Sequence, residues 1–147
     1  MDFKAQKQED ADRRTEPAYT QITHDIHVTV FPVYLKNQSR PYDNIYVWAY
    51  HICIENKGSE TFQLLSRYWK TTDALGRIQE VRGSGVIGEQ PTLPPGEAFE
   101  YTSSVTLSLS SGVMVGSYQM QSLNGGNIDV AIPLFSLDSP HETRTIH

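Results

Sequence analysis

Apolar and polar residues alternate with a period of two in one segment of the chain after another, and short clusters of Gly, Pro, Asn, Asp and Ser separate these segments. A period of two places successive side chains on opposite faces of a strand, so the pattern predicts β-strands and no helix. In one of the longest segments both faces are apolar, which predicts a central strand. The predicted strands cover residues 26–30, 45–54, 62–72, 77–82, 99–107, 114–120 and 128–132.

About seven short antiparallel strands in one chain are typical of an immunoglobulin-like or fibronectin type III-like β-sandwich. We therefore predict an all-β fold of that class, with a small closed barrel as the nearest alternative. Residues 1–19 are polar and carry few large apolar side chains, which predicts a flexible tail. Residues 20–140 are expected to form the sandwich domain, and residues 141–147 a frayed C-terminus.

The composition narrows the possible functions. The chain has 147 residues, the length of one domain, and a formal net charge of -5 without clustered Lys and Arg, which disfavours binding to nucleic acid or anionic lipid. No apolar run approaches the ~20 residues of a membrane span. Cys53 is the only cysteine, so no intramolecular disulfide forms and a cytoplasmic location is expected. The five histidines lack metal-ligand spacing, so we expect no metal and no cofactor.

The glycine-rich segment from Gly76 to Gly96 contains a GxGxxG match at Gly83, Gly85 and Gly88. A dinucleotide-binding fingerprint requires a helix after these glycines, but the prolines that follow, from Pro91 onward, exclude one. Two interpretations stay open. The glycines supply positive φ and close packing where the chain crosses between sheets, or backbone N–H groups bind an anion such as pyrophosphate. The residues of that anion site would be Arg82, Gly83, Ser84, Gly85 and Gly88, with Arg67 as the alternative source of positive charge.

A second candidate surface combines aromatic and basic residues, both common in interface hot spots. It comprises Arg67, Trp69 and Lys70, together with Tyr68. Strand alternation requires one of the two aromatic side chains to lie in the core, so only the other can contact a partner. The glutamates of the chain show no spacing that selects a catalytic pair, so catalysis is not expected.

Four segments of the chain closely resemble the ApaG family, also called the DUF525 domain. They are RYWKTTDALGR (67–77), EVRGSGVIGEQPTLPPGEAFEYTS (80–103), GVMVGSYQM (112–120) and DVAIPLFSLD (129–138). The resemblance covers about residues 20–140 and implies a fibronectin type III-like β-sandwich in a bacterial cytosolic protein. It provides no set of catalytic residues.

The functional implications of this resemblance are indirect. Genes of the family often neighbour that of a diadenosine tetraphosphate hydrolase, and genetic evidence links the family to cobalt resistance and magnesium efflux. Related domains occur in eukaryotic F-box proteins and in a DNA-polymerase-interacting protein, where they are inferred to bind proteins. We therefore expect a non-catalytic protein-interaction or regulatory module with an unidentified protein partner. The alternative is a protein that binds a phosphate-containing small molecule, and the chain is either a monomer or an edge-paired homodimer.

Overall fold

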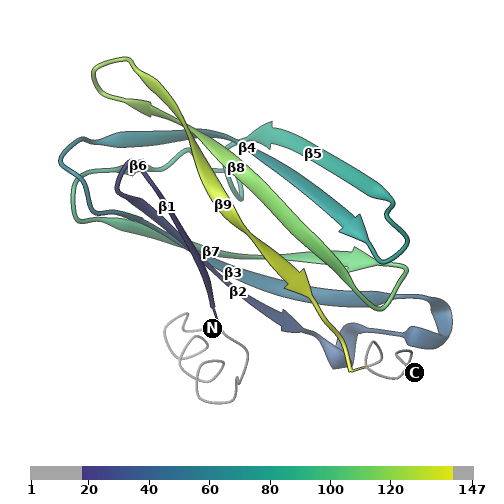
Figure 1. The fold of residues 1–147 in the computed structure, drawn as a ribbon. Helices are drawn as coiled ribbons and strands as arrows, with labels where there is room; N and C mark the ends of the chain where they lie inside the picture. Colours follow the sequence, from purple (N-terminus) through teal and green to yellow (C-terminus); the bar gives the residue numbers. More distant parts are fainter. Residues whose placement is uncertain (1–17, 141–147) are drawn as a thin grey trace.

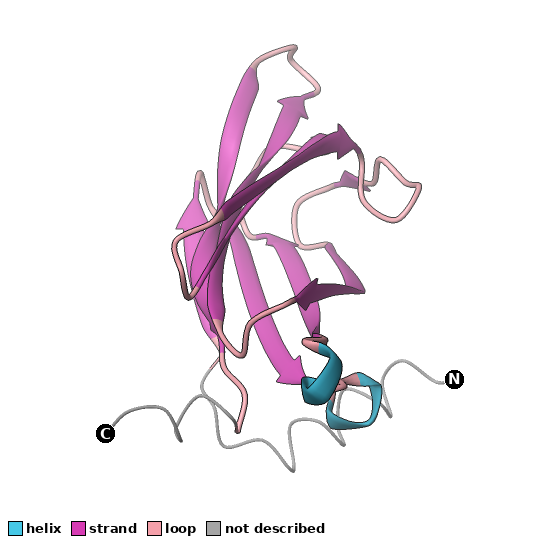
Figure 2. Cartoon of the chain, turned by 90° about the vertical axis from the view of Figure 1, so that its right-hand side faces the viewer, coloured by secondary structure: helices cyan, strands magenta, loops and turns pink. Residues whose placement is uncertain are grey.

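The computed structural model describes residues 18–140, which form β-strands and two short 3-10 helices (Figures 1 and 2). The predicted frayed C-terminus and most of the predicted N-terminal tail lie outside these residues. Only Ala18 and Tyr19 of the tail are described, and Tyr19 already begins the first strand. The elements are β1 (Tyr19–Thr23), β2 (Ile26–Tyr34), η1 (Lys36–Gln38), η2 (Pro41–Asp43), β3 (Tyr46–Asn56), β4 (Phe62–Asp73), β5 (Ile78–Ser84), β6 (Thr92–Leu93), β7 (Ala98–Leu107), β8 (Gly112–Ser122) and β9 (Asn127–Leu137).

The strands form two antiparallel sheets that face each other (Figure 1). One sheet has the order β1-β2-β3-β7, and the other has the order β5-β4-β8-β9, with β6 also paired to β4. The all-β sandwich prediction is confirmed. The sequence pattern did not predict two of the strands within the described residues. Strand β1 is largely exposed and therefore lacks apolar alternation, and β6 has only two residues. No helix within residues 18–140 has the length and apolar character needed to cross a membrane.

The core lies between the two sheets and is rich in aromatic side chains. Strand β3 runs between β2 and β7, as its two apolar faces predicted, and its inner face carries Trp48 and Tyr50. The ring of Trp69 on β4 lies 5.3 Å from the ring of Tyr50 and 6.0 Å from that of Phe135 on β9. These edge-on aromatic contacts join both sheets without a disulfide.

The two long sides of the sandwich differ. On one side β1 and β9 close the gap, where the Ala131 amide donates to the Thr23 hydroxyl at 3.2 Å and the rings of Tyr19 and Phe135 lie 6.1 Å apart. On the other side the edge strands are β5 and β7, and among the described residues these two strands form no ladder with each other. The sandwich is therefore open between β5 and β7.

One strand boundary differs from the sequence prediction. Pro133 was expected to end the last strand, but β9 continues to Leu137. The β8–β9 ladder shifts register between Met114 and Gly116, opposite Pro133, so the proline falls at an irregularity of an edge strand. Bulged edges are the positions where a sheet tolerates proline, because no regular ladder bond is lost.

The two neighbouring aromatic residues of β4 provide a test of the fold. Trp69→Ala should lower the free energy of unfolding by about 3–5 kcal/mol, because it removes a buried ring from the contact between the sheets. Tyr68→Ala should cost about 1 kcal/mol or less, since its side chain lies on the outer face and contacts Glu80 and Arg82. Urea denaturation of both variants measures the difference, and equal losses would contradict these positions.

Candidate groove between strands β5 and β7

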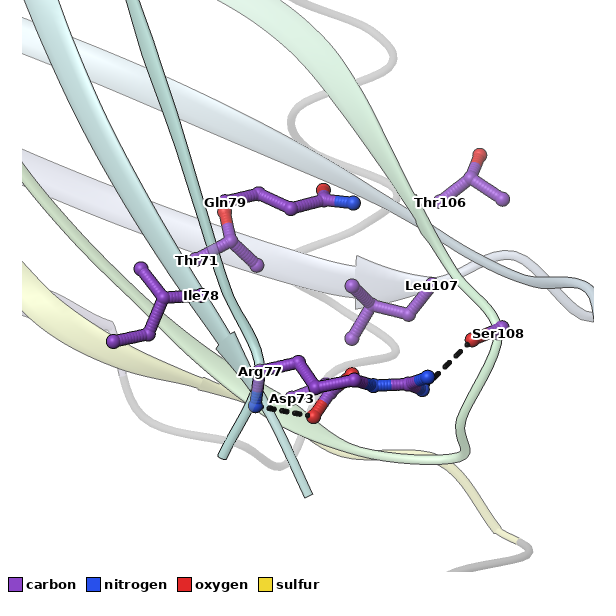
Figure 3. A pocket seen from close by; sticks show the side chains of 8 residues that line it. All are labelled: Thr71, Asp73, Arg77, Ile78, Gln79, Thr106, Leu107 and Ser108. Carbon is purple, nitrogen blue, oxygen red and sulfur yellow. Dashed lines mark hydrogen bonds and ion pairs between the residues drawn. The ribbon is translucent and has the colours of Figure 1, made fainter. Parts of the chain in front are cut away.

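Two adjoining cavities occupy the open side of the sandwich. The first has a volume of about 350 Å³ and lies between β4, β5 and β7. The second, shown in Figure 3, has a volume of about 340 Å³ and shares Thr71 and Gln79 with the first. Together they form one groove along the open side. The first cavity is lined by Tyr50, Arg67, Trp69, Thr71, Gln79, Val81, Val86, Ile87, Tyr101, Ser103, Ser104, Val105 and Met114.

Arg67 points into the first cavity from the inner face of β4. Its register partners are Gly83 on β5 and Tyr118 on β8, and Tyr118 is fully buried between the sheets. The Nη1 atom donates to the carbonyl oxygens of Ser84 and Gly85, both at 2.9 Å. A Cβ at Gly83 would lie 2.9 Å from Cζ and from both terminal nitrogens of Arg67. The first glycine of the motif therefore leaves space for the guanidinium group.

The other two motif glycines shape a tight hairpin next to Arg67. Val86 and Glu89 exchange backbone hydrogen bonds of 2.8 and 2.9 Å across a two-residue loop. The φ angles of Ile87 and Gly88 in this loop are 41° and 80°, the positive pair of a type I′ turn. Gly85 has a φ of 58°, and a Cβ there would lie 2.2 Å from the Glu89 carbonyl oxygen.

Ile87 is the unusual residue of this hairpin. A β-branched residue at positive φ is a conformational outlier, and such strain is concentrated at functional sites. Ile87 is nevertheless 58% exposed at the mouth of the groove. Val81 is also more than half exposed on the same rim. The hairpin therefore holds an apolar side chain in solvent beside the groove.

The structure places Arg67, and not Arg82, beside the glycines of the predicted anion site. The amide groups of Gly85, Val86 and Glu89 donate to carbonyl oxygens of Leu65, Glu89 and Val86. The side chain of Arg82 lies on the outer face of the sheet, with its Cζ 4.3 Å from the centre of the Tyr68 ring. Of the predicted group, Gly83, Ser84, Gly85 and Gly88 surround Arg67 or form the hairpin, whereas Arg82 faces away from them.

The interpretation that the chain crosses between the sheets at Gly83, Gly85 and Gly88 is wrong. Both β5 and β6 pair with β4, so residues 85–91 stay beside that strand. The chain crosses to the other sheet only after Leu93, through the turn at Pro94–Gly96 that leads into β7. Of the positive φ angles that we expected at Gly83, Gly85 and Gly88, those at Gly85 and Gly88 are present and that at Gly83 is not.

The predicted partner patch of Arg67, Trp69 and Lys70 is also divided by the strand. Trp69 is 5% exposed and belongs to the core, so it does not present a surface to a partner. Arg67 shares its inner face, whereas Lys70 lies on the outer face, as Tyr68 does. The aromatic residue on the outer face is therefore Tyr68, which is half-buried and whose hydroxyl donates to Glu80 at 2.5 Å.

Buried tyrosines lie beside Arg67 at the inner end of the groove. The hydroxyl oxygens of Tyr101 and Tyr118 lie 2.5 Å apart in a hydrogen bond between the two sheets. Burial raises the pKa of both groups well above the usual range, and the nearby charge of Arg67 opposes this shift only weakly. Tyr50, whose pKa burial also raises, is a neighbour. Alternation placed these rings inside, but their meeting across the sandwich has no signal in the sequence.

The far end of the groove is fixed by an ion pair (Figure 3). Nε of Arg77 lies 2.7 Å from a carboxylate oxygen of Asp73, and Nη2 donates to the Ser108 hydroxyl at 3.2 Å. Desolvation tends to raise the pKa of Asp73, but hydrogen bonds from Arg77 and Leu75 outweigh it and lower that pKa. These contacts connect the β4–β5 turn to the end of β7.

Another polar cluster lies on the opposite, outer face of the first sheet. The two ring nitrogens of His51 contact the hydroxyl of Thr102 at 2.9 Å and the carboxylate of Glu100 at 2.8 Å. The side chains come from neighbouring strands β3 and β7, and they do not line the groove. Within residues 18–140 no group of three or more His, Cys, Asp or Glu side chains is arranged to hold a metal ion.

These features define a small antiparallel β-sandwich with one closed side and one open, apolar-rimmed groove. The chain belongs to the ApaG family: the model of the ApaG domain (DUF525) matches residues 36–122. It is 60% identical to protein ApaG of Paramagnetospirillum magneticum over 124 residues, which cover 84% of this chain and 95% of that protein. It is 55% identical to protein ApaG of Parvibaculum lavamentivorans, covering 88% and 99% of the two chains.

Solved structures agree with this assignment. The crystal structure of the ApaA protein from Bordetella pertussis superposes with a TM-score of 0.75 and 42% sequence identity. The match covers 86% of this chain and 98% of that protein. The family resemblance drawn from the four sequence segments is confirmed.

The strain at Ile87 predicts a stabilising substitution. Ile87→Asn should raise the free energy of unfolding by about 1 kcal/mol, because Asn adopts positive φ more readily than a β-branched residue. The melting temperature should rise by about 4 °C. Leu123→Asn is the matched control, since Leu123 is also exposed but does not have positive φ, and it should change little. Calorimetry on both variants is the measurement, and a destabilised Ile87→Asn would refute the strain.

Proposed function

We propose that this ApaG-family domain is a non-catalytic protein-interaction module and that its partner docks in the groove between β5 and β7. The observation that carries the proposal is Ile87, an apolar side chain kept exposed at 58% in a strained backbone conformation. A sequence under selection for stability alone would place Gly or Asn there. The cost of this isoleucine indicates that its side chain serves binding.

The surroundings of Ile87 support the same function. Val81 is 51% exposed and lines the same cavity, and Ile78 of the same edge strand is 55% exposed and lines the adjoining one. Exposed apolar side chains that gather around a groove are typical of protein-binding sites. The edge strands β5 and β7 also offer backbone groups for an added strand. That a protein partner exists, and that the domain has a regulatory role, are both part of this proposal.

The alternative of a phosphate ligand held by the glycine loop gains less support. Three of the loop amides already donate within the protein. The family's links to metal resistance and to a nucleotide hydrolase gene fit a module that acts through a partner protein. A cytoplasmic location, and a monomer or an edge-paired homodimer, remain predictions from the sequence.

Affinity purification from the native cell extract tests the docking site. Ile87→Asn should lose a partner that the wild-type chain retains, although the variant is expected to be at least as stable. Leu134→Asn is the matched control, because Leu134 is 56% exposed on β9, away from the groove, and it should retain the partner. Retention by Ile87→Asn of every protein that wild type binds would refute the proposed site.

A further inference from the structure

Among the described residues, Arg67 has no acidic partner inside the groove. Its only hydrogen bonds among the described residues run from Nη1 to the carbonyl oxygens of Ser84 and Gly85. Nε and Nη2 find no acceptor within residues 18–140, and the side chain lines the cavity. Arg77 in the same groove, by contrast, forms an ion pair with Asp73. A half-buried guanidinium normally has a carboxylate partner, because desolvating an unpaired charge is costly.

The tyrosine pair supplies a second unused donor. Tyr101 and Tyr118 have two hydroxyl protons but share one hydrogen bond, so one proton has no acceptor among residues 18–140. Both side chains are buried, at 5% and 0% exposure. Tyr101 lines the cavity that contains Arg67. When Tyr118 donates to Tyr101, the proton of Tyr101 is left for an acceptor in that cavity.

We propose that the inner end of the groove binds one carboxylate group from an extended, otherwise apolar peptide segment of a partner protein. Arg67 and the Tyr101 hydroxyl donate to this carboxylate, and the peptide's apolar side chains lie on the rim formed by Val81, Val105 and Ile87. This assignment rests on the proposed function, since it names the chemistry of the partner at the same groove.

The charge of the cavity favours a carboxylate over a polyphosphate. Among residues 18–140, Arg67 is the only Lys or Arg that lines the first cavity, and most of the other lining side chains are apolar or hydroxylic. One guanidinium balances one negative charge, whereas a pyrophosphate would leave further charge unpaired in a largely apolar setting. A planar guanidinium also matches the two oxygens of a carboxylate. The carbonyl oxygens of Ser84 and Gly85 occupy Nη1, so the anion approaches from the cavity.

Selection from a phage-displayed library of random dodecapeptides tests this assignment on the full chain. Wild type should enrich peptides that carry one Asp or Glu among apolar residues. Arg67→Met should lose the preference for the acidic residue. Arg82→Met is the matched control, because Arg82 lies on the outer face over Tyr68, and it should keep the preference. Ile87→Asn should weaken binding of every selected peptide.

A double-mutant cycle then measures the contact itself. Replacing the acidic residue of a selected peptide by its amide should weaken binding to wild type roughly tenfold or more, the size expected for hydrogen bonds to a charged group. The same replacement should have almost no effect on binding to Arg67→Met. Tyr101→Phe removes one hydroxyl and should weaken the acidic peptide severalfold more than its amide form. This variant keeps the test decisive if Arg67→Met fails to fold.

The failures of the two proposals are distinguishable. Peptides that bind the groove without an acidic preference, or with a preference that Arg67→Met retains, would overturn the carboxylate site and leave the interaction module standing. Enrichment of no peptide, together with an unchanged partner profile for Ile87→Asn, would overturn both. In a last experiment, pyrophosphate is titrated into the protein and the NMR signal of the Arg67 Nε–H group is monitored. A saturable shift that acidic peptides do not compete would assign the site to a phosphate ligand instead.

Discussion

The position of one charge determines how this sandwich is built. Arg67 lies on the inner face of β4, where its neighbours along the strand are core residues, and an apolar sheet cannot seal over a guanidinium without a large desolvation cost. The protein leaves the β5 side open and supplies the carbonyl oxygens of Ser84 and Gly85. Gly83 gives the group its space. The groove therefore lets this cation lie between the two sheets without being fully buried.

Contacts on the opposite side and at one end of the sandwich hold the two sheets together. On the opposite side Thr23 and Ala131 join the two sheets, and Tyr19 covers Phe135. At one end Asn56 is fully buried, and its amide group donates to the carbonyl oxygens of Glu60 and Leu93. These bonds fix the point where the chain leaves β6 and crosses into β7. Strand β7 then runs along the open side, where its residues and those of β5 line the same cavity.

The sequence predicted what depends on alternation and little of what depends on register. The two apolar faces of β3 identified a central strand, and the prolines after Gly88 correctly excluded a nucleotide-binding helix. The contact between Arg67 and Gly83 was not predictable, because it depends on the exact register in which β4 pairs with β5. The Tyr101–Tyr118 bond has the same origin, since those side chains meet only across the two sheets. The pattern of apolar and polar residues identifies the buried face of a strand, whereas a site depends on which residues lie opposite each other on different strands.

The GxGxxG match acquires a different physical meaning from this geometry. Gly83 leaves space for a guanidinium, whereas Gly85 and Gly88 meet the backbone demands of a hairpin, so all three glycines are explained without a phosphate. Each of them relieves strain. Ile87 adds strain, because glycine or asparagine would adopt its φ of 41° more easily. Within this motif we therefore infer that Ile87, and none of the three glycines, contributes to binding; it lies at the mouth of the cavity that contains Arg67.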